Sequence, residues 1–128
     1  MDLVHDLRQL LAAEADVQTA WLFGSRARGT HRHDSDIDIA VLFSNEVEDL
    51  RRFDLQTRLC IALGMPVQIV PVRRAAADLV RRVLRDGQLL LDRNRANRVA
   101  FEVKKRIEYF DMTPIWRTIR RLPPGVAP

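Results

Sequence analysis

Two short segments contain side chains that could together bind a triphosphate and a metal ion. Gly24-Ser25 directly follows the apolar run Thr19–Phe23, and Asp36-Ile37-Asp38 opens a run rich in Ile and Val. On a strand, residues i and i+2 point to the same face, so Asp36 and Asp38 are expected to aim together. Two adjacent carboxylates repel each other and are tolerated when a divalent cation lies between them. The spacing therefore predicts an Mg²⁺ site.

The Gly24-Ser25 segment has the properties of a phosphate-binding turn. Glycine lets a backbone approach a ligand closely, and a helix that starts just after a strand presents free N–H groups. The Ser25 hydroxyl adds a donor, and the guanidinium groups of Arg26 and Arg28 pair well with phosphate. Alone, Gly-Ser is usually a turn and Asp-x-Asp is often an exposed strand edge. Together, each beside an apolar strand, they indicate a nucleoside triphosphate bound with Mg²⁺.

Apolar periodicity predicts the elements that must position this motif. The expected strands are Thr19–Phe23, Asp36–Phe43, Pro66–Val72 and Gln88–Leu91, and the expected longer helices are 2–15, Glu46–Leu63, Ala75–Arg85 and Arg93–Phe110. A short helix is expected within Ser25–Gly29. Since the loop joining the first two strands is shorter than a crossover helix, the pattern favours an α/β or α+β domain on a small mixed sheet of about four strands flanked by helices.

Composition narrows the class of protein. The chain has 128 residues, which suits one domain, and its 21 Lys and Arg against 17 Asp and Glu suit a polyanionic ligand: nucleic acid, a nucleotide or an acidic protein. The apolar runs are too short to span a bilayer, so no membrane association is expected. The N-terminus lacks the apolar stretch of a signal peptide, and Cys60 is the only cysteine. A cytoplasmic protein is therefore expected.

The sequence around the motif also resembles a known family. The segments that carry the resemblance are Gly24-Ser25-Arg26-Ala27-Arg28-Gly29-Thr30 and Ser35-Asp36-Ile37-Asp38-Ile39-Ala40-Val41. They resemble the signature of the minimal nucleotidyltransferases, in the polymerase-β-type nucleotidyltransferase superfamily, and most closely the MntA-like antitoxins encoded beside HEPN-domain toxins. The resemblance runs to about Met112. It implies a polymerase-β-like nucleotidyltransferase domain at 1–112 and a C-terminal tail at 113–128.

The resemblance implies a role for each motif residue. ATP and two Mg²⁺ ions would bind, and AMP would pass to an acceptor hydroxyl with release of pyrophosphate. Gly24 and Ser25 would hold the β- and γ-phosphates with Arg26 and Arg28 nearby, while Asp36 and Asp38 would be the metal-binding and catalytic carboxylates. Active relatives carry a third carboxylate on the next strand, where this chain has Gln68. An amide cannot act as a general base, so this departure leaves nucleotide binding in place and puts turnover in question.

The same resemblance implies a partner. The chain has no room for a domain that holds an acceptor, and in the MntA-like group the acceptor is a tyrosine of the HEPN toxin ribonuclease, which AMP addition neutralises. The alternative is a nucleotide-binding antitoxin that occludes its toxin without chemistry. A weaker alternative is RNA binding through the basic helix that contains Lys104-Lys105-Arg106.

The sequence does not assign a role to two apolar patterns near the C-terminus. Within the basic helix, a stripe is formed by Val99, Val103, Ile107 and Phe110. In the tail, Trp116, Ile119 and Leu122 repeat at helical spacing, so the tail is expected to form a short amphipathic helix starting near Pro114. That helix could pack on its own domain, which we slightly favour, or dock a partner.

Overall fold

The computed structural model describes residues 2–30 and 35–121, and within these it describes side chains up to Phe110. The elements in chain order are α1 (Leu3–Ala12), β1 (Val17–Phe23), α2 (Ser25–Arg28), β2 (Ile37–Phe43), α3 (Asp49–Leu63), β3 (Val67–Pro71), α4 (Ala77–Asp86), β4 (Gln88–Asp92) and α5 (Arg95–Arg121). Every strand and helix expected up to Phe110 is present, with ends that shift by a few residues except in α5.

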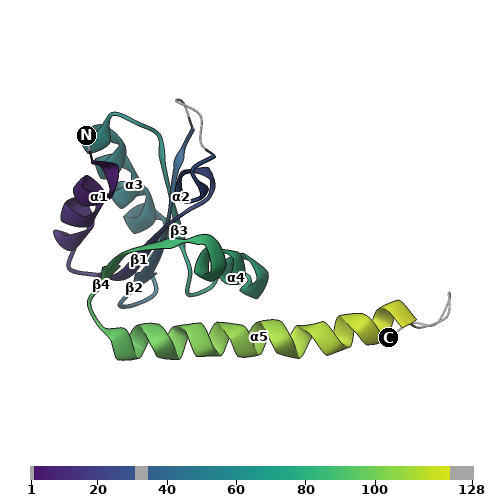
Figure 1. Cartoon of the computed structure of the whole chain (residues 1–128). Coiled ribbons are helices and arrows are strands. Elements are labelled where there is room, and N and C mark those ends of the chain that lie inside the picture. The colour runs from purple at the N-terminus through teal and green to yellow at the C-terminus, as the bar shows by residue number, and fades with distance from the viewer. Residues whose placement is uncertain (1, 31–34, 122–128) are drawn as a thin grey trace.

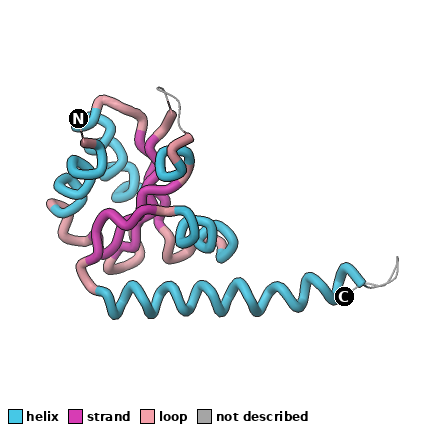
Figure 2. Tube along the Cα trace, viewed as in Figure 1, coloured by secondary structure: helices cyan, strands magenta, loops and turns pink. Residues whose placement is uncertain are grey.

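The four strands form one mixed sheet in the order β3-β2-β1-β4 (Figures 1 and 2). Strand β1 pairs antiparallel with both β2 and β4, whereas β2 and β3 run parallel. The parallel pair requires a crossover, and α3 supplies it. The expected small mixed sheet of four strands flanked by helices is confirmed.

Alternating side chains of the strands build a core on each face of the sheet. On one face Ile37, Ile39 and Val41 of β2 pack in a cluster that includes Leu7 of α1 and Leu55 of α3. On the other face Ala40 and Leu42 of β2 pack with Trp21, with Val80 and Val83 of α4, and with Phe101 of α5. The period of two along β2 thus places α1 and α3 on one side and α4 and α5 on the other, as Figure 1 shows.

Local signals set several helix ends. The Asp2 side chain accepts a hydrogen bond from the His5 N–H and caps α1. Helix α3 ends at Gly64, whose φ of 66° lies in the left-handed region that favours glycine. These ends agree with the sequence-based expectation.

Helix α5 is longer than expected. It was predicted to end at Phe110, but it continues to Arg121 without a break at Pro114. Proline removes one backbone hydrogen bond but leaves those of neighbouring turns intact, so a helix can pass through it. Residues 113–121 are therefore part of α5 and form no separate helix. The side chains of Trp116, Ile119 and Leu122, and residues 122–128, lie outside what the structure describes, so the expected packing of the tail stays a prediction.

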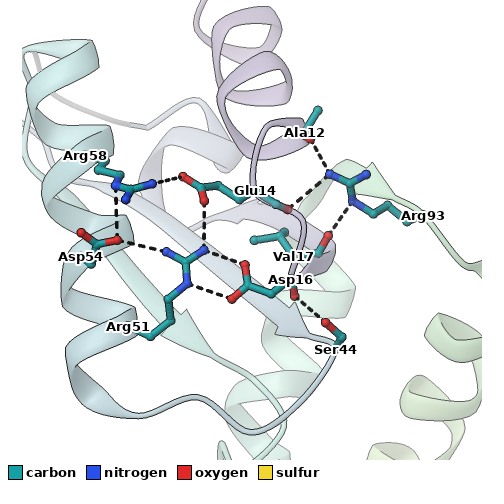
Figure 3. Close-up of polar contacts among 9 residues, drawn as sticks. All are labelled: Ala12, Glu14, Asp16, Val17, Ser44, Arg51, Asp54, Arg58 and Arg93. Carbon is teal, nitrogen blue, oxygen red and sulfur yellow. Dashed lines mark hydrogen bonds and ion pairs between the residues drawn. The ribbon is translucent and has the colours of Figure 1, made fainter.

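An arginine-centred network holds α3 against the loop between α1 and β1 (Figure 3). The Arg51 guanidinium donates to both carboxylate oxygens of Asp16, at 2.8 and 2.6 Å, and to Glu14 at 3.0 Å. Arg58 also donates to Glu14 at 3.2 Å. Because these bonds join segments far apart in the sequence, they fix how α3 lies on the sheet.

No helix in the described part of the chain combines the length and the apolar character needed to cross a membrane.

Candidate functional site

The two motif segments meet where β1 ends and β2 begins. In the antiparallel pairing of these strands, Phe23 at the end of β1 lies opposite Asp38 near the start of β2. Gly24 follows Phe23 directly, and Asp36 precedes β2 by one residue. Antiparallel pairing thus brings together segments that a loop separates in the sequence, as the spacing predicted.

Gly24 lies so close to Asp38 that a side chain in its place would force the Asp38 carboxylate to move. Its φ of 75° and ψ of −156° define a conformation almost exclusive to glycine. A Cβ added there would overlap the Oδ2 atom of Asp38. The backbone of the turn therefore lies directly against a carboxylate of the Asp-x-Asp pair.

After Gly24 the chain turns at once into the four-residue helix α2. The Gly24 carbonyl accepts a hydrogen bond from the Arg28 N–H at 3.2 Å, and the Thr30 N–H donates to the Ser25 carbonyl at 3.0 Å. The first N–H groups of a helix have no acceptor within it, so those at Ser25 and Arg26 have none inside α2. Gly29, with a φ of 72°, ends the helix.

Asp36 and Asp38 differ in their surroundings. Asp36 is exposed, whereas Asp38 is half-buried. Burial raises the pKa of the Asp38 carboxyl, the neighbouring Asp36 carboxylate raises it further, and the charge of Arg28 opposes the shift. The pair is thus a site of electrostatic repulsion that a bound cation would relieve.

The two arginines of the motif have different environments. The Arg26 guanidinium donates to the Ser35 carbonyl from Nε at 3.3 Å and from Nη2 at 2.9 Å. Arg26 therefore ties α2 to the residue that precedes the aspartates. The Arg28 side chain is exposed and, among the described residues, makes no hydrogen bond or ion pair. Its guanidinium remains available to a phosphate.

Gln68 occupies the position that the sequence suggested. It is the partner of Asp38 in the parallel pairing of β2 with β3, and it is exposed. Residues paired across neighbouring strands project from the same face of a sheet, so the Gln68 amide lies beside the aspartates. Within the described residues, no group of three His, Cys, Asp or Glu side chains is placed to hold a metal ion.

Sequence reasoning missed Asp86, the last residue of α4. The hydrogen bond from Arg85 is the main cause that lowers the pKa of the Asp86 carboxyl, and the charge of Arg28 adds a smaller contribution in the same direction. Arg28 also acts on the charge of Asp38, so its guanidinium lies within electrostatic range of both carboxylates. No local pattern could have shown this, because Asp38 and Asp86 belong to elements far apart in the sequence.

Comparison with known sequences identifies the motif region. Residues 5–96 match the family model described as polymerase beta, nucleotidyltransferase. Over 74 residues, 58% of the chain, the sequence is 38% identical to the protein adenylyltransferase MntA of Shewanella oneidensis. This match covers 53% of that relative, so the chain spans about half of its length.

Solved structures extend the similarity to most of the chain. A crystal structure of a toxin-antitoxin with AMP-PNP aligns with a TM-score of 0.81 and 30% identity, covering 91% of this chain and 94% of that one. The structure of the tri-AMPylated Shewanella oneidensis HEPN toxin in complex with its MNT antitoxin aligns with a TM-score of 0.73 and 27% identity, covering 91% of each chain. The fold is thus similar to that of chains in these toxin-antitoxin structures.

Proposed function

This chain belongs to the polymerase beta nucleotidyltransferase family, and we propose that it is an antitoxin that transfers AMP from ATP to a hydroxyl group, a tyrosine in the first instance, of a HEPN toxin. The observation that carries the proposal is the placement of Gly24 against Asp38, beside Asp36 and an unpaired Arg28. The relatives found in HEPN toxin complexes supply the acceptor class.

Different residues of the site would bind different parts of the ATP–Mg²⁺ complex. The backbone of Gly24 and Ser25 would hold the β- and γ-phosphates, and Arg28 would add a positive charge to the same anion. The carboxylates of Asp36 and Asp38 would hold two Mg²⁺ ions. They fit that role because a cation stabilises two neighbouring carboxylates, of which Asp38 has a pKa raised by burial and, further, by the charge of Asp36. Bound Mg²⁺ supplies charge neutralisation at the transferring phosphoryl group.

The transfer exchanges a phosphoanhydride bond of ATP for a phosphoester bond to the acceptor. The acceptor oxygen forms a bond to the α-phosphorus of ATP, the bond from that phosphorus to the bridging oxygen breaks, and pyrophosphate leaves. The acceptor proton passes to water or to a base of the toxin, because the Gln68 amide beside Asp38 cannot accept it. Catalysis therefore rests on positioning and electrostatics, and on an acceptor that the partner presents.

The reaction fits the cytoplasm. ATP and Mg²⁺ are plentiful there, and a chain whose only cysteine is Cys60 needs no oxidising compartment.

A second candidate function follows from Gln68. Without a third carboxylate the chain could bind nucleotide and neutralise the toxin by occlusion alone. RNA binding through α5 remains a weaker alternative, which would show as salt-sensitive RNA affinity that survives loss of the aspartates.

The decisive experiment measures whether the mass of the toxin increases. The purified chain is incubated with the toxin encoded beside it, ATP and Mg²⁺, and the intact toxin is analysed by mass spectrometry. We expect the mass of one or more AMP groups to be added, and none when Asp36→Asn and Asp38→Asn are combined. An unchanged toxin with intact ATP would refute the enzymatic proposal.

The same pair of substitutions separates transfer from occlusion. If the double variant leaves the toxin unmodified but still abolishes its ribonuclease activity at equal concentration, occlusion is the mechanism. If neutralisation is lost together with AMP addition, chemistry is the mechanism.

A further inference from the structure

Helix α5 carries an apolar stripe that its own domain does not cover. Val99, Val103, Ile107 and Phe110 are 41%, 46%, 55% and 62% exposed. Monomeric proteins rarely leave large apolar side chains exposed in a contiguous row, and such rows mark interaction surfaces. The stripe therefore requires an explanation beyond the packing of this chain.

The stripe lies on the side of α5 that faces away from the sheet. The inward side is marked by Phe101, which packs in the core with Trp21, and by Lys105, which is 6% exposed. The Lys105 ammonium donates to the Ala75 carbonyl at 2.9 Å and so ties the helix to the start of α4. At about 100° per residue, Val103 and Ile107 lie opposite these anchors. The fold thus fixes α5 with its apolar stripe turned outward.

The spacing of the stripe suits a helix as its partner. Ala96 and Ala100 are exposed and extend it toward the start of α5. Ala96, Ala100, Val103, Ile107 and Phe110 follow one another at intervals of 4, 3, 4 and 3 residues. This is the heptad-type repeat that packs side by side with a second helix. Figure 1 shows that α5 projects beyond α4.

The border of the stripe is positively charged. The side chains of Arg95, Lys104 and Arg106 are exposed and, among the described residues, form no hydrogen bond or ion pair. The two acids of α5 whose side chains are described are engaged with other cations: Glu102 pairs with Arg98, and Glu108 pairs with Lys105. Among the side chains described up to Phe110, the border of the stripe is therefore cationic.

A groove adjoins the stripe and has the same charge. It has a volume of about 330 Å³ and is lined by residues that include Ala100, Lys104 and Arg73. Ala100 belongs to the stripe and Lys104 to its border, so groove and stripe form one surface. An acidic side chain flanking a docked helix could enter this groove and meet the free Lys104 ammonium.

Charge decides between two kinds of helical partner. In a pair formed by two copies of this chain, cations would flank both helices, and like charges across a helix pair are unfavourable. A different protein whose helix has an apolar face bordered by Asp and Glu would gain both apolar burial and favourable charge pairing.

We propose that the surface formed by Val99, Val103, Ile107 and Phe110 of α5, with its cationic border, docks an acidic amphipathic helix of the toxin partner. The identity of that partner rests on the proposed function. The surface lies on α5, whereas the nucleotide motif lies at the junction of β1 with β2. Docking on α5 would therefore hold the toxin while leaving the nucleotide site open to the acceptor.

The test compares two double variants, each of which alters a pair of exposed apolar positions on a different helix. Val103→Glu combined with Ile107→Glu alters the stripe, and the matched control Leu50→Glu with Ile61→Glu alters exposed positions of α3, each 78% exposed. Affinity for the purified full-length toxin is measured by titration calorimetry. We expect the stripe variant to bind at least about 100-fold more weakly and the control to bind within about threefold of the unaltered chain. Circular dichroism and affinity for AMP-PNP are expected to be unchanged in both variants.

A second variant tests the charge component. Lys104→Glu with Arg106→Glu is expected to weaken binding by about tenfold at low salt and to flatten the dependence of affinity on ionic strength. Equal salt dependence with and without these cations would contradict an acidic partner.

Three results would overturn the docking surface. They are a stripe variant that binds the toxin as tightly as the unaltered chain, no binding by the unaltered chain, and a dimer of this chain in ultracentrifugation that the stripe variant converts to a monomer. The outcome for AMP transfer is scored separately by the mass of the toxin. Tight, stripe-dependent binding without added AMP would refute the enzymatic proposal and support the docking surface.

Discussion

The Oδ2 atom of Asp38 occupies the space that a side chain on Gly24 would need. The turn that would carry the phosphates is therefore in direct contact with one of the two carboxylates that would carry the metal. Phosphate and metal bind as one unit in nucleotidyl transfer, so this contact sets the distance between their sites. Perturbing it should affect chemistry more than folding.

Replacing Gly24 tests this contact, and Gly29 provides the control. Both glycines have positive φ, so either substitution by Ala costs about 1–3 kcal/mol of stability. A Cβ at Gly24 must also displace Asp38, whereas nothing lies within 4 Å of one at Gly29. We expect Gly24→Ala to reduce AMP transfer by about 100-fold and Gly29→Ala by far less. Thermal unfolding and transfer rates check both, and equal losses of activity would contradict the steric argument.

The raised pKa of the Asp38 carboxyl predicts that the folded chain loses stability as pH rises. Its carboxyl has a raised pKa in the folded chain, because burial and then Asp36 disfavour its charged form. The contribution of the protonated Asp38 carboxyl to the free energy of unfolding is fully present below the unfolded-state pKa of about 4. It is lost as pH rises through the folded-state pKa. Asp38→Asn should therefore raise the melting temperature at pH 7 without metal, and the gain should shrink as pH falls through the folded pKa and be absent below the unfolded-state pKa of about 4. Unfolding scans at several pH values check this, and a variant less stable at pH 7 would contradict it.

The two arginines of the motif should separate structure from ligand binding. Arg26→Ala removes the two hydrogen bonds to the Ser35 carbonyl and should lower stability by about 1–2 kcal/mol as well as activity. Arg28→Ala should leave the melting temperature unchanged and weaken nucleotide binding by about tenfold, because its guanidinium has no described partner. Chemical denaturation and titration with AMP-PNP distinguish the two. A stability loss in Arg28→Ala instead of Arg26→Ala would reverse the assignment.

Arg51 should contribute more to stability than a surface arginine. Arg51→Met leaves Asp16 and Glu14 without their main donor and should cost about 1–3 kcal/mol. The control Arg74→Met breaks an exposed pair with Glu46 and should cost at most about 1 kcal/mol. Urea denaturation measures both, and equal costs would contradict a structural role for the network.

The same network predicts an acid transition. The hydrogen bond from Arg51 is the main cause that lowers the pKa of the Asp16 carboxyl in the folded chain. Its contribution is present above the unfolded-state pKa of about 4 and is lost as pH falls through the folded pKa. The difference in stability between the unaltered chain and Arg51→Met should therefore narrow below about pH 4, and a constant difference would contradict this cause.

Introducing a carboxylate at Gln68 tests whether its absence limits the chemistry. Gln68→Asp places a carboxylate next to Asp38 on the neighbouring strand and should raise the rate of AMP transfer by at least about tenfold. Gln68→Asn keeps an amide at the same position and should not. Single-turnover rates with the toxin as acceptor provide the measurement. An unchanged rate in Gln68→Asp would show that this position does not limit the chemistry.

Most of the fold could be predicted because its signals are local. Alternation in β2, the glycine that ends α3 and the apolar runs of the strands depend on neighbouring residues, and the mixed sheet follows from their order. Helix α5 was the exception, since a proline predicts a helix end even though a helix can continue through it.

The sequence by itself determined the motif: which carboxylates share a face, which glycine precedes the turn, and which strand carries Gln68. The tertiary structure decided which other residues these side chains contact. The parallel register placed Gln68 beside Asp38, and the fold of the turn engaged Arg26 with Ser35 while leaving Arg28 unpaired. The periodicity of α5 showed that an apolar stripe exists. Only the packing of Phe101 and Lys105 against the domain turned that stripe outward, because a helix buries the face whose contacts are available.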